Sequence, residues 1–125
     1  MYDILLIDDD PDDAWLTRRL GQEFDASIEH APDGPAGLAA LRRRAEQAKL
    51  PDLVLLDINM PGMNGHGVLR AIRGDEALQH VPIVMLTTSD APRDVEAAAT
   101  GDADGYITKP VRRGHFLDAL DLIRR

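Results

Sequence analysis

The chain has 125 residues and a formal net charge of −8 at pH 7. A chain of this length folds as one domain with a sizeable core. Its 44% hydrophobic and 29% charged residues are an ordinary composition for a globular protein. The acidic balance argues against nucleic-acid binding through this domain, because phosphate backbones attract basic surfaces.

The sequence contains no cysteine, which excludes disulfides and thiolate metal sites. Its longest apolar runs, such as IVML at 83–86, are too short to cross a bilayer. The start of the chain shows no basic-then-apolar export signal. We therefore expect a cytoplasmic protein without a membrane partner.

Five short segments along the chain predict β-strands. In chain order they are DILLI (3–7), ASIEH (26–30), DLVLLD (52–57), PIVML (82–86) and DGYIT (104–108). Three of them contain continuous apolar runs, which are typical of central parallel strands covered on both faces. ASIEH is more polar, so we expect it at an edge of the sheet.

The residues between these strands follow helical patterns. The first helix is predicted to begin at Pro11, because proline suits a first helical turn and Asp10 can cap it. Its apolar side chains recur every four residues, at Leu16, Leu20 and Phe24. This pattern predicts an amphipathic helix that packs against the sheet.

The same helix carries Asp12 and Asp13 in its first turn, where carboxylates suit the positive end of the helix dipole. Further helices are predicted at GLAALRRRAEQA (37–48, starting near Asp33-Gly34), HGVLRAIRG (66–74) and PRDVEAAAT (92–100), and from about Arg113. The last helix places four apolar residues on one stripe: Phe116, Leu117, Leu120 and Ile123.

Five strands alternating with five helices predict an α/β fold, a doubly wound five-stranded parallel sheet in a three-layer sandwich. In such folds the ligand binds beyond the carboxyl ends of the strands. The predicted strand ends carry polar side chains: Asp8, Asp9, Asp57, Thr87, Thr88 and Lys109. We therefore expect these side chains to face one crevice.

The carboxylates of this crevice need a positive partner. Two of them about 4 Å apart repel by roughly 4 kcal/mol at an effective dielectric near 20. Hard oxygen ligands select Mg²⁺ or Ca²⁺, and Lys109 supplies a second cation. Together with the hydroxyls of Thr87, Thr88 and Ser89, they form an electrostatic site for a phosphoryl group. Asp57 is the natural nucleophile, because a carboxylate can form an acyl phosphate.

Each of these residues also has a structural explanation when it is taken alone. An aspartate or threonine at a strand end is most often a cap or a turn residue, and a single lysine is most often on the surface. Chance does not readily place all of them on successive central strand ends. The joint arrangement therefore favours a functional site.

Four stretches of the chain carry a resemblance to a known family. They are LLIDDD (5–10), LLDINMPGMNG (55–65), IVMLTTS (83–89) and YITKP (106–110). In this order and spacing, the chain resembles the CheY-like receiver domain of two-component response regulators over essentially its whole length. The resemblance implies a single receiver domain over residues 1–125. It also implies that Asp57 accepts a phosphoryl group from the phosphohistidine of a sensor histidine kinase.

The resemblance also implies a cofactor and its ligands. Mg²⁺ would be held by Asp9, Asp57 and the backbone carbonyl of Asn59, with Asp8 acting through water. Thr87 would hydrogen-bond a phosphoryl oxygen, the amide of Thr88 would add a donor, and Lys109 would pair with another oxygen. The Lys109–Pro110 peptide bond would be cis, an isomer that is accessible chiefly before proline.

A surface switch follows from the same resemblance. Phosphorylation would draw Thr87 inward and let Tyr106 follow, which rearranges the surface formed by the fourth helix, fifth strand and fifth helix. Asn59 and Ser89 would tune hydrolysis of the acyl phosphate. Independently of the family, Gly62 and Gly65 in the loop after Asp57 permit positive φ.

Two other classes of function remain alternatives. A phosphatase of the haloacid dehalogenase type would use Asp8 as nucleophile and Asp10 as acid/base, but Pro11 and Asp12 do not fit its motif. A binding module that is never phosphorylated would not require the intact set of strand-end residues. The chosen function is not that of an enzyme with an external substrate, although the domain would catalyse its own phosphorylation and dephosphorylation.

Partners are suggested by fewer residues. The PDDA, LTTS and YITKPV stretches resemble regulators of phytochrome-type kinases, and both a stand-alone regulator and part of a longer one fit. Trp15 lies off the first helix's apolar stripe and would either pack at the sheet edge or join a kinase-docking face. A homodimer through the face formed by the fourth helix, fifth strand and fifth helix is expected. Leu122 suggests it, because this apolar residue lies off the core stripe of the last helix. The four histidines show no ligand spacing and are expected on the surface.

Overall fold

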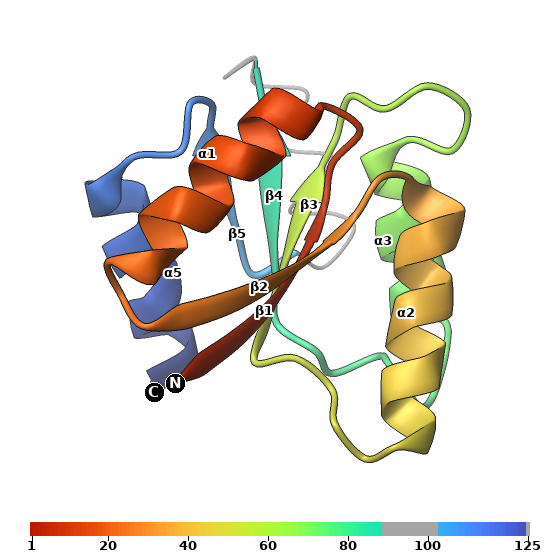
Figure 1. Cartoon of the computed structure of the whole chain (residues 1–125). Helices are drawn as coiled ribbons and strands as arrows, with labels where there is room; N and C mark the ends of the chain where they lie inside the picture. The colour runs from red at the N-terminus through yellow and green to blue at the C-terminus, as the bar shows by residue number, and fades with distance from the viewer. Residues whose placement is uncertain (89–102, 125) are drawn as a thin grey trace.

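A computed structural model describes residues 1–88 and 103–124 of the chain. It shows a five-stranded sheet between two layers of helices (Figure 1). The strands are β1 (Tyr2–Ile7), β2 (Ala26–Ala31), β3 (Leu53–Asp57), β4 (Ile83–Thr87) and β5 (Gly105–Thr108). The helices are α1 (Pro11–Gln22), α2 (Gly34–Glu46), α3 (Gly65–Arg73) and α5 (Arg113–Arg124).

The predicted fold class is confirmed, and each predicted strand bound lies within one residue of the observed bound. The helix predicted at 92–100 falls outside the described residues. None of the helices in the described part of the chain is both long and apolar enough to span a membrane.

The strand order is β2-β1-β3-β4-β5, and every neighbouring pair is parallel. β2 lies at an edge, as its polar sequence predicted. The chain leaves β1 towards β2 on one side and returns to β3 on the other, so the order reverses between β1 and β3. In open parallel sheets a crevice forms at the carboxyl ends of two such strands.

The core lies on both faces of the sheet, because successive side chains of a strand point to opposite faces. Ile4 and Leu6 of β1 pack in the cluster on the side of α1 and α5, together with Phe116. Leu5 and Ile7 pack in the cluster on the side of α2 and α3. All four β1 side chains are fully buried. This two-sided burial explains why the central strands are apolar without alternation.

The helix faces differ from the predicted stripes. Leu16 is 55% exposed and Leu117 is 44% exposed. The prediction that these two side chains belong to the buried faces of their helices was therefore wrong. α1 instead buries small residues, because it approaches the sheet closely: a Cβ atom on Gly21 would lie 2.7 Å from the Ile28 side chain. On α5, Ala119 takes the buried position that Leu117 was expected to share.

The loop after β3 depends on two glycines for different reasons. Gly62 has φ +76°, in agreement with the sequence. Gly65 does not have positive φ; it is the first residue of α3. A Cβ atom there would lie 2.3 Å from the Asp57 carbonyl oxygen. Gly65 is therefore required by the close approach of α3 to the end of β3, which fixes the backbone at Asp57.

We predict that Gly65→Ala destabilises the fold by about 1–3 kcal/mol, because the added methyl must displace backbone rather than a flexible side chain. The matched control is Gly67→Ala on the same helix, where a Cβ atom makes only ordinary contacts with Met63. That change should be neutral or stabilise by up to about 1 kcal/mol. Urea unfolding of the two variants measures the difference; equal stabilities would contradict this role for Gly65.

Candidate functional site

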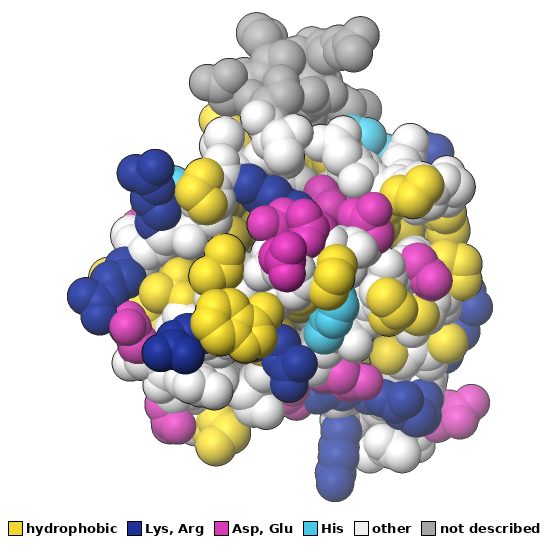
Figure 2. Space-filling view, turned by 45° about the horizontal axis from the view of Figure 1, so that its top comes forward, with side chains coloured by type: hydrophobic (Ala, Val, Ile, Leu, Met, Phe, Trp, Pro, Cys, Tyr) yellow, Lys and Arg dark blue, Asp and Glu magenta, His cyan; other side chains and the backbone are white. Residues whose placement is uncertain are grey.

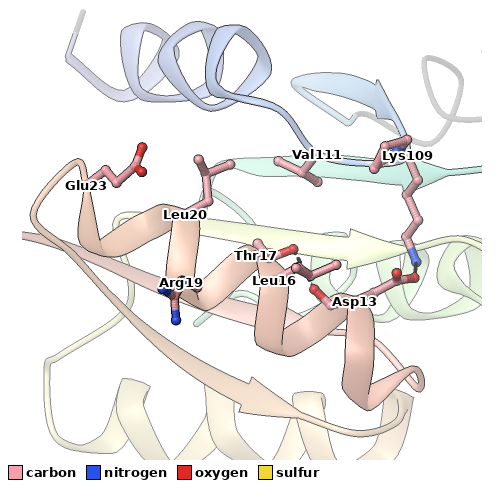
Figure 3. A pocket seen from close by; sticks show the side chains of 9 residues that line it. Asp13, Leu16, Thr17, Arg19, Leu20, Glu23, Lys109 and Val111 are labelled. Atoms are coloured by element: carbon pink, nitrogen blue, oxygen red, sulfur yellow. Dashed lines mark hydrogen bonds and ion pairs between the residues drawn. The ribbon is translucent and has the colours of Figure 1, made fainter.

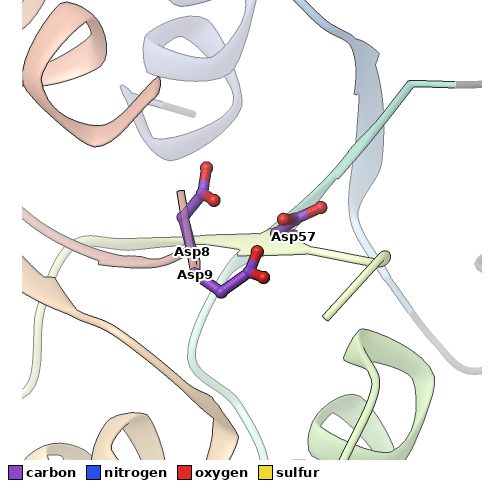
Figure 4. A group of neighbouring side chains, drawn as sticks. All are labelled: Asp8, Asp9 and Asp57. Carbon is purple, nitrogen blue, oxygen red and sulfur yellow. The ribbon is translucent and has the colours of Figure 1, made fainter. Parts of the chain in front are cut away.

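Three carboxylates meet at the carboxyl ends of β1 and β3. Asp8 and Asp9 directly follow β1, and Asp57 ends β3. Each of the three places one oxygen within 4.8 Å of the other two, and Figure 4 shows the three side chains converging. Asp8 and Asp57 are almost fully buried, whereas Asp9 is exposed. The sheet thus brings Asp57 beside two carboxylates that lie 48 and 49 positions earlier in the chain.

Lys109, which follows β5, reaches across this cluster. Its Nζ lies 3.1 Å from Asp8 Oδ2, 3.3 Å from Asp57 Oδ2 and 3.1 Å from Asp13 Oδ2. One ammonium group therefore contacts three carboxylates. Figure 2 shows a compact group of acidic side chains on the surface of the molecule, with basic and hydrophobic side chains beside it.

The two oxygens of Asp57 have different partners. The backbone N–H of Asn59 donates to Oδ1 at 3.1 Å, and Lys109 contacts Oδ2. Ile58 directly follows Asp57, and its backbone N–H donates to the carbonyl oxygen of Leu86 at 2.8 Å, which continues the pairing of β3 with β4. The carboxylate is therefore held in a defined orientation by the end of the sheet.

The electrostatics of the site act on two groups in opposite ways. Burial raises the pKa of Asp57 to about 6, and the charge of Asp8 adds to this rise, while Lys109 and the Asn59 amide oppose it. Burial alone would lower the pKa of Lys109, but the charges of Asp8 and Asp57 outweigh it and raise the pKa above the ordinary value. Lys109 therefore remains an ammonium ion, and Asp57 is a carboxylate that costs folding free energy.

The other predicted site residues lie on β4, on β5 and in the segments that follow β3, β4 and β5. Thr87 ends β4 and is buried, whereas Tyr106 of β5 is 47% exposed. The Asn59 side-chain amide donates to the Thr88 hydroxyl at 3.2 Å, which links the loop after β3 to the end of β4. The Lys109–Pro110 peptide bond is cis. Ser89 lies outside the described residues.

Two further residues of the site were not identified from the sequence. Asp13 was assigned only to the helix dipole, yet its carboxylate contacts Lys109. His30 was expected on the surface, yet its Nε2 donates to the Asp8 carbonyl at 2.7 Å. The parallel pairing of β1 with β2 sets Leu6 beside His30, so the register brings the histidine next to Asp8. The pairing register of these two strands is therefore the feature from which the position of His30 could have been inferred.

The donor set fits a hard divalent cation. Mg²⁺ binds oxygen at about 2.1 Å, so oxygens on opposite sides of one ion are about 4.2 Å apart. One carboxylate oxygen from each of the three aspartates lies within 4.8 Å of the other two, so they can converge on one ion. Carboxylate oxygens without thiolate or imidazole ligands also favour Mg²⁺ over the softer transition metals. A cation of this kind would offset the negative charge of the carboxylates that the single positive charge of Lys109 does not neutralise.

The raised pKa of Asp57 predicts a pH-dependent stability difference. The pKa is about 6 in the folded chain, against 3.8 for an unperturbed aspartate. The folded state therefore holds this proton more tightly, and stability falls as pH rises between those values. Asp57→Asn removes this titration. We expect the stability of the variant relative to the native chain to increase by about 1 kcal/mol from pH 5 to pH 7.5.

Urea unfolding in a metal chelator at the two pH values measures this difference. A stability difference that stays constant, or that shrinks towards pH 7.5, would contradict the raised pKa.

Comparisons with known proteins agree with this geometry. The family model described as the response regulator receiver domain matches residues 4–121. The DNA-binding response regulator MtrA of Mycolicibacterium smegmatis is 43% identical over 111 residues, which cover 87% of this chain and 44% of MtrA. The chain thus spans less than half the length of that relative.

Solved structures are similar as well. The bacteriophytochrome response regulator RtBRR is 31% identical with a TM-score of 0.84, over 98% of this chain and 78% of that chain. The Mn²⁺-bound form of response regulator Rcp1 is 30% identical with a TM-score of 0.77, over 99% of this chain and 90% of that chain. The bacteriophytochrome relative supports the predicted likeness to regulators of phytochrome-type kinases. The chain belongs to the family of response regulator receiver domains of two-component signalling.

Proposed function

We propose that this chain accepts a phosphoryl group on Asp57 from the phosphohistidine of a sensor histidine kinase, and that its surface changes in response. The observation that carries the proposal is the placement of Asp57. This carboxylate is buried at the end of β3, held by the Asn59 amide and Lys109, and set beside Asp8 and Asp9.

Mg²⁺ is the cofactor that the carboxylate cluster suits. Asp9, Asp57 and the Asn59 carbonyl would hold it, with Asp8 acting through water. When bound, Mg²⁺ neutralises negative charge on the phosphoryl oxygens. The description of Rcp1 as Mn²⁺-bound supports a divalent cation in a relative of the same fold.

The phosphoryl transfer itself uses Asp57 Oδ2, the oxygen beside Lys109. This oxygen attacks phosphorus, and the P–N bond to the kinase histidine breaks with its electron pair remaining on the imidazole nitrogen. Lys109 pairs with one phosphoryl oxygen, the Thr87 hydroxyl donates to another, and the Thr88 amide adds a donor. These groups stabilise charge on the transferring group, which is the main source of rate in such reactions.

Hydrolysis returns the domain to its starting state. Water attacks phosphorus, the bond to Asp57 breaks, and its electron pair restores the carboxylate as inorganic phosphate leaves. Asn59 and Ser89 tune this step in the proposal, and the Asn59–Thr88 hydrogen bond places the Asn59 side chain beside the end of β4. The chain acts only on its own aspartate and needs no external substrate site.

The phosphatase alternative finds little support at the residues it requires. Asp10 would have to act as acid/base, but its carboxylate accepts hydrogen bonds from the Asp12 and Asp13 amides at 2.9 and 3.3 Å and caps α1. Asp8 accepts from the Asp10 amide at 2.9 Å and pairs with Lys109. Both carboxylates of that mechanism are therefore engaged in local structure.

A kinase of the phytochrome type is the proposed phosphoryl donor, in keeping with the similarity to RtBRR. Trp15 supports a docking surface on α1, because it is 58% exposed. Arg19 stacks over its ring, 5.3 Å from the centroid. Tryptophan and arginine are both enriched among the residues that contribute most to the binding energy of interfaces.

The proposed surface switch involves Thr87 and Tyr106. A phosphoryl group on Asp57 attracts the Thr87 hydroxyl, and the space that it vacates lets the Tyr106 ring move inward from its exposed position. The switch requires the phosphoryl group to favour one packing over the other by a few kcal/mol.

Self-association is proposed on the same face. Tyr106 and Leu122 line a hollow of about 330 Å³ between β5 and α5, and both side chains are partly exposed. A second copy of this chain would cover these apolar side chains. The fourth helix of this face lies outside the described residues.

The phosphoacceptor is tested by Asp57→Asn. We expect this variant to take up no phosphate from acetyl phosphate in the presence of Mg²⁺, because a weakly nucleophilic amide replaces the carboxylate. The control is Asp25→Asn, an exposed acid that contacts the N-terminal amine, which should behave like the native chain. Intact-protein mass spectrometry measures incorporation; full incorporation into Asp57→Asn would favour the phosphatase alternative.

Two substitutions on α5 test the proposed dimer face. Leu122→Asp should lower self-association of the phosphorylated chain at least tenfold, because a charge would be buried against a second copy. Leu117→Asp is the matched control, since Leu117 is exposed on α5 and does not line the hollow. Sedimentation velocity measures the dissociation constants. Equal values for the two variants would overturn this face.

A further inference from the structure

The Asp13–Lys109 ion pair joins two segments that are 96 residues apart in the chain. Asp13 lies in the first turn of α1, and its amide is already used by the Asp10 cap. Its carboxylate turns to Lys109, and Figure 3 shows the two side chains meeting at one end of a pocket. The helix dipole accounts for an acid at this position, but it does not account for this contact.

The ammonium group of Lys109 has no spare donor in this arrangement. A lysine ammonium carries three N–H groups, and Lys109 has three carboxylate oxygens within 3.3 Å, from Asp8, Asp13 and Asp57. A phosphoryl oxygen that approaches Lys109 while Asp57 is still a carboxylate must therefore displace one of these three oxygens. The question is which carboxylate gives way.

The exposed fractions of the three carboxylates indicate which one can most easily lose its contact with Lys109. The side chains of Asp8 and Asp57 are 1% and 3% exposed, whereas that of Asp13 is 39% exposed. A buried carboxylate that loses its cation keeps a large desolvation cost. Water can replace Lys109 at Asp13 at little cost, because exposed ion pairs contribute little. Asp13 is therefore the partner that Lys109 can leave most easily.

We propose that Asp13 is a positioning residue for phosphoryl transfer. It holds Lys109 in the unphosphorylated domain and releases it when a phosphoryl oxygen arrives at Asp57. The inference rests on the proposed function, because it requires Asp57 to be the phosphoacceptor.

The exchange also changes the surface next to the site. Asp13 and Lys109 lie at one end of a pocket of about 300 Å³ between α1 and the chain after β5, which Leu16, Leu20 and Val111 also line. Before phosphorylation the ion pair ties α1 to this segment. Afterwards the tie is absent, and Asp13 presents an unpaired carboxylate to the pocket.

The test compares two neutralising variants on one helical turn. Asp13→Asn removes the competing carboxylate, while Asp12→Asn removes an equal charge from an exposed residue whose amide only joins the cap. With acetyl phosphate as donor and Mg²⁺ present, Asp13→Asn should be phosphorylated about threefold to tenfold faster than Asp12→Asn. Asp13→Glu, which restores a carboxylate, should return the rate towards that of the native chain.

A second measurement does not depend on rates. A crystal structure of the native chain with Mg²⁺ and beryllium trifluoride, a mimic of the phosphoryl group, should show Lys109 Nζ more than about 4 Å from the Asp13 carboxylate, beyond ion-pair distance. The contact with Asp8 should be retained.

Three results would count against these proposals. Equal phosphorylation rates for Asp13→Asn and Asp12→Asn would overturn the role of Asp13 alone, as would an intact Asp13–Lys109 pair in the mimic complex. A native chain that takes up no phosphate would overturn the proposed function, and the role of Asp13 with it.

Discussion

The site depends on an imbalance of charge that the fold enforces. One ammonium ion, Lys109, faces the carboxylates of Asp8, Asp13 and Asp57 at 3.1–3.3 Å. Burial and the neighbouring Asp8 raise the pKa of Asp57 to about 6, so its carboxylate is destabilising at neutral pH. The folded domain tolerates this cost because the backbone at each strand end is fixed by the sheet. A divalent cation and a phosphoryl group are the partners that such a site can bind.

The parallel sheet supplies the geometry, and its core supplies the rigidity. Reversal of strand order between β1 and β3 brings Asp8 and Asp57 to one crevice. The core on both faces holds these strands in place. Gly65 lets α3 approach the Asp57 backbone more closely than any side chain would permit. Because the core holds the strand ends in place, we expect a change of charge at Asp57 to be answered by side chains, and Lys109 contacts Asp57 directly.

The sequence predicted the sheet and the acidic cluster because both follow from local patterns: continuous apolar runs mark central strands, and polar residues directly follow them. The helix faces were less predictable, because the closeness of α1 to the sheet depends on how Gly21 packs on Ile28. Leu16 therefore lies outside the core although its spacing fits. The contact of Asp13 with Lys109 spans 96 residues, so no local pattern could reveal it.

The central claim is that the carboxylate of Asp57 carries the phosphoryl group. Borohydride reduces an acyl phosphate to an alcohol and so marks the aspartate that carried phosphorus. After phosphorylation by the histidine kinase or by acetyl phosphate, reduction and peptide mass spectrometry should find homoserine at position 57. Homoserine at position 8, or at neither position in a chain that has taken up phosphate, would contradict the account.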